Sequence, residues 1–186
     1  ALVLAFLAPA AVAQDVVYGK EHNATTLWGT WSSGSGAVLT GSGFAIPSNE
    51  TFIYPNNTGI SYSFTDDGYY EISRFRFVSN ASYPSCITGT MIWVHGKYDF
   101  VTNGSIILYP VFSDGYQQVQ DRCAADSNFM QDYNYTELID HWLIGEDATK
   151  GYYLQLYTYD GSALAPQYQV STTPIMLPTY RLRNST

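Results

Sequence analysis

Positive charge is scarce in this chain of 186 residues, where Lys and Arg number 8 against 16 Asp and Glu, for a net charge of −8. Nucleic-acid binding draws most of its affinity from clustered cations, so nucleic acid is excluded as a partner. Histidine is also rare, and His22, His95 and His141 lack the close His/Cys/Asp spacing of a zinc site. We therefore expect neither a metal nor another cofactor.

Catalytic motifs are missing as well. The sequence contains no Gly-x-Ser-x-Gly nucleophile turn, no phosphate-binding loop and no dinucleotide fingerprint. The acidic pairs Asp66-Asp67 and Glu146-Asp147 are interpreted as solvated acids of turns and connections rather than as catalytic pairs. His95 lies in an alternating apolar run, which favours a hydrogen-bonded residue of a sheet over a catalytic base. We predict that the protein is not an enzyme and has no catalytic residues.

Long apolar runs are absent except at the start, where residues 1–13 read ALVLAFLAPAAVA and end in the small-residue pattern that signal peptidase accepts. A membrane-spanning helix needs about 20 apolar residues, so we interpret this run as the remnant of a signal peptide. The remaining length suits one folded domain, and we place it at residues 14–179.

Cysteine occurs only twice, as Cys86 and Cys123. In an oxidising compartment, an isolated pair far apart in sequence is most simply one disulfide, which would stabilise the fold by roughly 3 to 4 kcal/mol on the loop-closure model. The alternative is a redox-active pair, but catalytic dithiols usually stand two residues apart. We favour the structural disulfide.

Asparagine shows the strongest compositional signal, because seven of nine asparagines begin an Asn-x-Ser/Thr sequon. Such sites carry glycans in secreted proteins and should lie on turns and exposed edges. The predicted N-glycosylation sites are Asn23, Asn49, Asn56, Asn80, Asn103, Asn134 and Asn184.

Aromatic residues make up 16% of the chain, with 17 Tyr, and they recur in short alternating runs that are typical of strands. Three pairs of such runs flank turn dipeptides and predict hairpins: Asp67-Gly68, Asn103-Gly104 and Asp160-Gly161. Further strands are expected in residues 28–33 and 37–46. Residues 134–144 could be a strand or a short helix, and we predict a strand.

About eight strands with short connections predict an all-β fold, an antiparallel meander that closes into a lipocalin-like up-and-down barrel or, alternatively, folds into a β-sandwich. The succession of hairpins favours the barrel. Gly29-Thr30-Trp31, followed later by Asp-Gly-Tyr, is similar to the short motif of lipocalin-like barrels. There the Trp closes one end, so Trp31 is expected to be structural rather than a ligand contact.

Taken in order, a set of segments resembles the fungal Rot-one family. These are WGTWSS (28–33), TGSGF (40–44), SYSFTDDGYYE (61–71), Cys86, HGKY (95–98), NGSIILYP (103–110), Cys123, NYTE (134–137), YLQLYTYDG (153–161) and IMLPT (175–179). Each motif is weak alone, but their order and the cysteine positions are specific together. The resemblance covers residues 28–179.

The resemblance implies an endoplasmic-reticulum membrane chaperone that is required for cell-wall β-1,6-glucan assembly and acts without ATP. Its implied partners are incompletely folded secretory and membrane proteins, other lumenal chaperones and glucan-synthesis proteins. The family typically ends in a membrane helix after a polar linker, so we interpret residues 180–186 as the start of that linker. The implied location is the lumenal side of the endoplasmic-reticulum membrane, with a single-pass type I anchor beyond this chain.

Three hypotheses make different demands on the surface. A chaperone should expose an apolar patch for extended chains. A glucan- or glycan-binding module should present an aromatic platform flanked by polar groups. A glycoside hydrolase should place two carboxylates about 5 to 10 Å apart across a cleft, and the sequence disfavours it. Alternation defines two faces of each strand without identifying the solvated one, so the sequence does not locate a client-binding surface.

Overall fold

The structure, a computed structural model, describes residues 26–183. Within this range it contains twelve strands: β1 (Gly29–Ser33), β2 (Ala45–Ile46), β3 (Thr51–Phe52), β4 (Gly59–Phe64), β5 (Tyr69–Ser79), β6 (Ile87–Phe100), β7 (Ile106–Pro110), β8 (Tyr116–Asp121), β9 (Asn128–Asp132), β10 (Glu137–Asp147), β11 (Gly151–Thr158) and β12 (Gln167–Ser171). One 3-10 turn, Pro47–Asn49, joins β2 to β3. The all-β prediction is confirmed.

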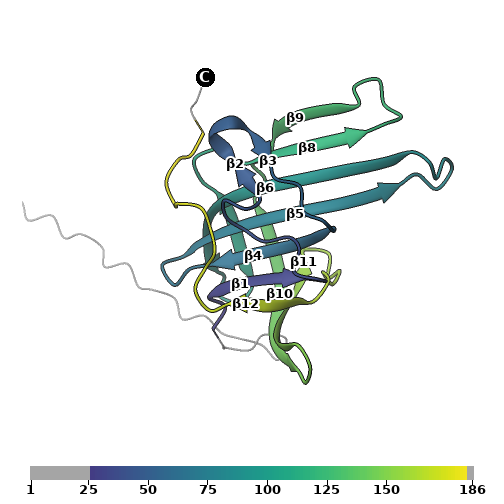
Figure 1. The fold of residues 1–186 in the computed structure, drawn as a ribbon. Helices are drawn as coiled ribbons and strands as arrows, with labels where there is room; N and C mark the ends of the chain where they lie inside the picture. Colours follow the sequence, from purple (N-terminus) through teal and green to yellow (C-terminus); the bar gives the residue numbers. More distant parts are fainter. Residues whose placement is uncertain (1–25, 184–186) are drawn as a thin grey trace, which may run out of the picture.

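Eight of these strands close into a barrel-like ring. Around the ring the order is β1, β4, β5, β6, β7, β10, β11 and β12, and β12 pairs back with β1. Every neighbouring pair is antiparallel. The strands therefore follow chain order, as the predicted meander does, except that β2–β3 and β8–β9 are hairpins inserted outside the ring (Figure 1).

The three predicted turns join consecutive strands of the ring. Gly68, Gly104 and Gly161 all have positive φ, at 86°, 93° and 77°, which glycine adopts without steric cost. Residues 137–147 form β10, so the predicted strand in this region is also confirmed. The strand expected in residues 37–46 is mostly wrong, because only Ala45–Ile46 pair. In the rest of that segment, polar groups bond to other parts of the fold, such as Gly41 N–H to the Glu71 carboxylate.

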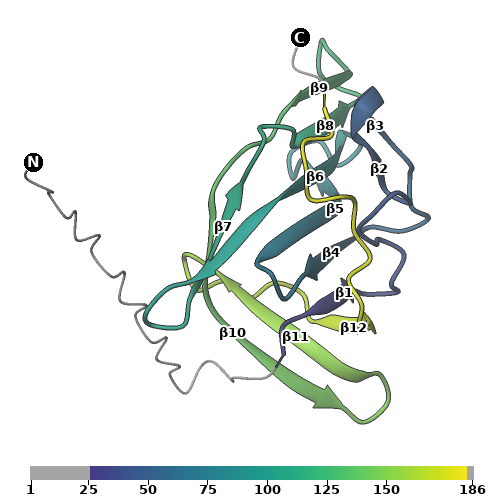
Figure 2. The same ribbon diagram turned by 90° about the vertical axis from the view of Figure 1, so that its left-hand side faces the viewer.

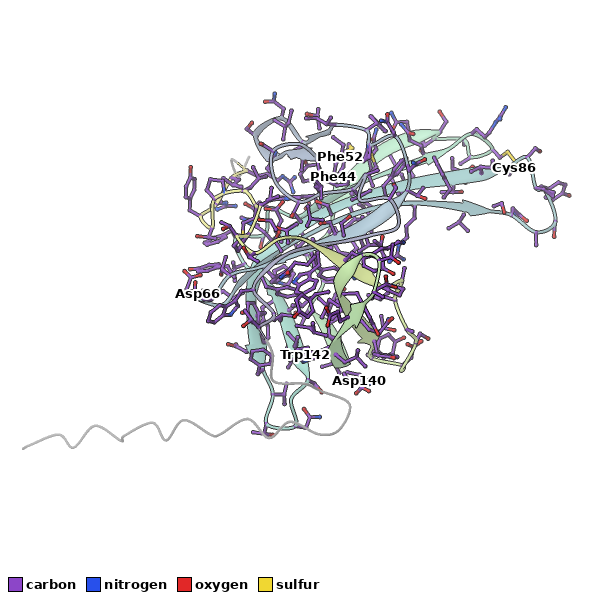
Figure 3. The ribbon with its side chains drawn as sticks, turned by 60° about the horizontal axis from the view of Figure 1, so that its bottom comes forward. Phe44, Phe52, Asp66, Cys86, Asp140 and Trp142 are labelled. Atoms are coloured by element: carbon purple, nitrogen blue, oxygen red, sulfur yellow. A yellow bond between two sulfur atoms is a disulfide. The ribbon has the colours of Figure 1, made fainter. Side chains whose placement is uncertain are left out.

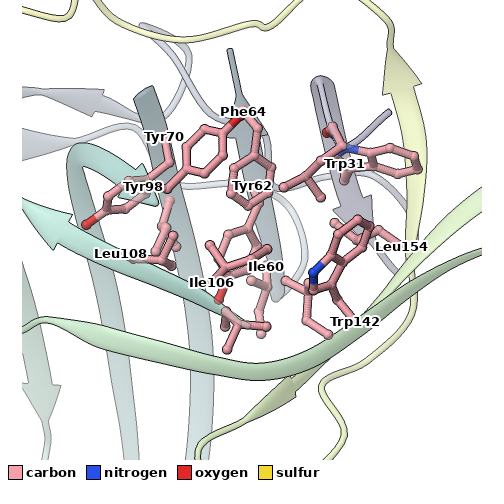
Figure 4. Close-up of a cluster of buried hydrophobic side chains, with 14 of the residues drawn as sticks. Trp31, Ile60, Tyr62, Phe64, Tyr70, Tyr98, Ile106, Leu108, Trp142 and Leu154 are labelled. Atoms are coloured by element: carbon pink, nitrogen blue, oxygen red, sulfur yellow. The ribbon is translucent and has the colours of Figure 1, made fainter. Parts of the chain in front are cut away.

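The main core fills the ring (Figure 4). Tyr62 and Phe64 of β4 point inward together with Tyr70 and Ile72 of β5, and Trp142 of β10 reaches them from the opposite wall. Trp31 is 1% exposed, and its indole N–H donates to the carbonyl of Leu27 at 2.8 Å. It belongs to this core, which agrees with a structural role.

A second core lies on the outer face of β5, β6 and β8. Phe75, Met91, Trp93 and Tyr116 from these strands are covered by the segment of residues 38–52, whose Phe44 and Phe52 are labelled in Figure 3. The sheet is thus sandwiched at its base between the ring core and this outer layer.

Beyond that base, the sheet extends as an arm, which we define as residues 76–90 and 117–132. It forms because β6 is 14 residues long and divides its edge between two partners, with Gly96–Phe100 paired to β7 and Thr88–Trp93 to β8. The arm leaves the ring as a four-stranded sheet in the order β5, β6, β8, β9 (Figures 1 and 3).

The end of the described chain, residues 174–183, runs as a strap along the outer layer (Figure 2). The Ile175 carbonyl accepts hydrogen bonds from Thr40 at 2.6 Å and Ser63 at 3.0 Å. Leu177 N–H donates to the Glu71 carboxylate at 2.5 Å. The strap therefore connects the 38–52 segment to the ring strands beneath it.

Candidate functional site

The arm exposes apolar side chains on both of its faces, because no second layer of residues 26–183 covers its outer part. Phe77 is 60% exposed and Val78 is 63% exposed, and they point to opposite faces of β5. The other exposed large apolar residues of the arm are Tyr83, Ile87, Phe129 and Met130. A group of exposed apolar side chains on one element often marks an interaction site.

A hollow of about 370 Å³ lies beside Phe77 and Val78, at the end of β4. We call it the edge hollow. Its apolar wall consists of Ile60, Phe75, Phe77, Val78 and Ala165, and its remaining lining is Ser33, Gly34, Thr58, Gly59 and Arg76.

The Phe77 ring is held in a defined position above the sheet. It contacts Phe75 edge to face, with ring centroids 4.9 Å apart. On β6 it lies over Gly89, where an added Cβ would come within 3.1 Å of the ring. The glycine thus leaves room for the aromatic side chain, which remains largely exposed while fixed in place.

A second hollow, of about 440 Å³, opens at the adjacent end of the ring. We call it the ring-end hollow. Its lining is polar and aromatic: Arg74, Arg76, Tyr133, Thr136, Glu137, Leu138, Thr158, Tyr159 and Leu164. Arg76 lines both hollows, so the two are neighbours around the base of β5.

An ion pair stands at the floor of the ring-end hollow. Arg74 donates to both carboxylate oxygens of Glu137, at 2.9 and 2.5 Å, and also to the Tyr62 hydroxyl at 2.6 Å. Burial raises the pKa of Tyr62, so this hydroxyl stays protonated at neutral pH. Arg74 Nε is buried and has no partner among the described residues. Sequence reasoning missed this pair because its members lie in strands far apart along the chain.

The histidines do not come together. His22 lies outside the described residues; His95 is buried, with Nε2 2.7 Å from the Asp114 carboxylate. His141 stacks on Tyr157, with ring centroids 3.9 Å apart. Among residues 26–183, no group of three or more His, Cys, Asp or Glu side chains is placed to hold a metal ion.

The two cysteines are joined by a disulfide at the tip of the arm (Figure 3). The Cα atoms of Cys86 and Cys123 are 5.6 Å apart. The bond connects the end of the β5–β6 loop to the β8–β9 loop, so it closes the distal end of the four-stranded sheet.

All five sequon asparagines in the described range are exposed: Asn49, Asn56, Asn80, Asn103 and Asn134. At two of them the side-chain oxygen accepts from the main chain two residues later, Asn80 from Ser82 at 2.9 Å and Asn103 from Ser105 at 3.1 Å. Both contacts are Asx turns. Asn23 and Asn184 lie outside the described residues, and glycosylation stays a prediction.

The part of the chain that matches a known family is nearly the same as the part that the structure describes. Residues 27–186 match the model of a family described as Rot1, a chaperone for protein folding within the ER, fungal. No solved structure matches the chain. Between residues 26 and 183, no helix has the length and apolar composition needed to cross a membrane.

Several curated fungal proteins are similar over most of the chain. The protein rot1 of Botryotinia fuckeliana is 44% identical over 167 residues, which cover 89% of this chain and 63% of that protein. The protein ROT1 of Saccharomyces cerevisiae is 41% identical over 172 residues, covering 91% of this chain and 66% of that protein. The chain thus spans somewhat less than two thirds of the length of these relatives.

Proposed function

Because the chain belongs to the Rot1 family of fungal ER chaperones, we propose that it binds incompletely folded secretory and membrane proteins in the lumen and shields their apolar segments without using ATP. The observation that carries this proposal is the client surface, defined as Phe77, Val78 and the edge hollow. An apolar surface kept exposed by a disulfide-closed arm suits the capture of extended chains. The lumenal location is supported by the sequons and the cysteine pair.

The test uses the protein secreted from a fungal host, so that its disulfide and glycans form. It is mixed at near-stoichiometric ratio with a chemically denatured, unglycosylated model protein, without ATP, and light scattering is followed. We expect suppression of aggregation. The double variant Phe77→Ser/Val78→Ser should lose most of it, because it removes the apolar area while keeping the strand.

The matched control is Tyr152→Ser/Val170→Ser, which removes two side chains that are about half exposed on the ring, far along the chain from the arm. This variant should suppress aggregation as the wild type does. Equal loss in both variants would contradict a localised client surface, and no suppression by the wild type would contradict the chaperone proposal itself.

Glucan assembly is the finer part of the proposal. We infer that cell-wall β-1,6-glucan depends on this protein through the folding of the enzymes that make it, with other lumenal chaperones and glucan-synthesis proteins as further partners. The support is the family resemblance together with the apolar client surface. Attachment to the membrane is proposed on the resemblance alone.

Direct glycan binding is the second candidate, and the ring-end hollow is the observation that favours it. Tyr159 is 77% exposed at its rim, beside Arg76 and Glu137, and an aromatic face next to charged hydrogen-bonding groups suits a sugar ring. Calorimetric titration with β-1,6-linked gluco-oligosaccharides tests it. Binding that Tyr159→Ala abolishes, without aggregation suppression by the wild type, would place this function first.

A further inference from the structure

We propose that clients bind by strand addition, with an extended client segment pairing with the free edge of β5 at Phe77 and Ser79. The inference rests on the proposed function and names the main-chain groups through which it works. Its support comes from the pairing pattern, the edge hollow and the charge of Arg76.

The pairing pattern shows where the edge of β5 is free. β4 pairs with β5 from Phe64↔Tyr70 only as far as Gly59↔Phe75, whereas β5 continues to Ser79. The bond from Thr65 N–H to the Tyr69 carbonyl fixes the alternation, so odd-numbered residues of β5 face β4. The bond from Asn80 N–H to the Cys86 carbonyl shows that even-numbered ones face β6. The N–H and C=O groups of Phe77 and Ser79 therefore point away from the sheet, and no main-chain group of residues 26–183 bonds to them.

Native proteins usually protect such an edge with proline, a bulge or inward charges. The sequence from Arg76 to Ser79, RFVS, contains none of these beyond Arg76 itself. Instead, the edge hollow lies alongside, at the place where a strand continuing the line of β4 would run. Unpaired main-chain groups next to an apolar hollow favour an extended polypeptide as the ligand. Its main chain can bond to the edge of β5, and its apolar side chains can fill the hollow.

The charge of Arg76 indicates which client sequences would bind best. Arg76 makes no ion pair in the described part of the chain. A client residue opposite Arg76 would point to the same face as its guanidinium. Gly59 already occupies the position opposite Phe75, so the neighbouring client residue lies opposite Phe77 and points toward its ring. The preferred segment therefore has an acidic residue opposite Arg76, at the end that meets Gly59, followed by apolar residues opposite Phe77 and Ser79.

The other free edge of the arm, β9, provides a matched control. Tyr133 N–H donates to the Gly115 carbonyl, so odd-numbered residues of β9 face β8 and Met130 N–H points outward. This edge ends in Asp132, whose carboxylate pairs with Arg183 at 2.9 Å. A fixed charge of this kind discourages strand addition. Proline can replace Phe77, Ser79 or Met130 without removing a hydrogen bond of the sheet.

The probe is a five-residue peptide, Thr-Val-Thr-Val-Glu, with fluorescein at its N-terminus and an amidated C-terminus, so that the glutamate meets Gly59 when the peptide runs antiparallel to β5. Its twin ends in lysine instead of glutamate. Fluorescence anisotropy measures the affinity, and circular dichroism with thermal unfolding checks the fold of each variant. We expect Phe77→Pro and Ser79→Pro each to weaken binding at least tenfold, and Met130→Pro to change it less than twofold. Arg76→Glu should reverse the preference between the two peptides.

Amide hydrogen exchange of the wild type supplies a second measurement that needs no variant. Peptide binding should slow exchange at Phe77 and Ser79 and leave Met130 unchanged. Equal affinities of Phe77→Pro and Met130→Pro, or unchanged exchange at Phe77 and Ser79, would overturn strand addition. If the proline variants still suppress aggregation, strand addition is wrong while the chaperone proposal stands. If the wild type suppresses no aggregation, the chaperone proposal fails, and the peptide titration still shows whether the edge of β5 binds an extended segment.

Discussion

Asp114 has no exposed surface, and its carboxylate accepts hydrogen bonds from His95 at 2.7 Å and from Leu182 N–H at 2.8 Å. Burial alone would raise its pKa, but these hydrogen bonds hold the pKa of Asp114 below its ordinary value of 3.8. The carboxylate thus links the ring to the strap in its charged form.

This lowered pKa predicts an acid-sensitive contribution to stability. A carboxyl that ionises more readily when folded stabilises the protein fully above its unfolded pKa, and the contribution disappears as pH falls through the folded pKa. Urea unfolding of the wild type at pH 2 to 6 should therefore show stability rising with pH in the acid range. Asp114→Asn, which does not titrate, should have a lower free energy of unfolding at pH 6 and a shallower slope; identical slopes would contradict the assignment.

At the scale of elements, the arm depends on the disulfide because, in the part of the chain that the structure describes, its distal strands have neither a second layer nor a neighbouring ring strand. Replacing both cysteines, as Cys86→Ala/Cys123→Ala, should increase amide exchange in residues 78–88 and 121–128 while β4 and β12 stay protected. The global cost is expected to be roughly 3 kcal/mol on the loop-closure model. Hydrogen exchange read by mass spectrometry checks this, and uniform deprotection of the ring would argue against an independent arm.

Elements with a local signal were predictable, and those fixed by distant partners were not. The turns at Gly68, Gly104 and Gly161 carry their own chemistry, so the hairpins follow from the sequence. The division of β6 between β7 and β8 has no local mark, because both halves alternate in the same way. Likewise, the exposure of Phe77 and Val78 depends on where β4 ends, which is why the client surface was missed.

At the scale of the whole molecule, the strap closes the fold from the outside. Its main-chain N–H groups donate hydrogen bonds to two buried carboxylates, Leu177 to Glu71 and Leu182 to Asp114. Burial raises the pKa of Glu71. A chain that ends at Thr173 lacks the N–H groups of Leu177 and Leu182, so each carboxylate loses one hydrogen-bond donor. Each loss should lower the free energy of unfolding by about 1 to 3 kcal/mol. We expect a loss of at least about 2 kcal/mol in urea unfolding. A chain ending at Arg183 keeps every one of these contacts and should match the full chain.

The closed ring also sets the order in which the protein can be completed during synthesis. β1 is among the first strands to leave the ribosome, yet its partner β12 lies at residues 167–171. Until that late strand emerges, β1 and β11 each present an unpaired edge to everything around the nascent chain. The protein that we propose as a folding helper must therefore itself pass through a stage in which its own strand edges are exposed.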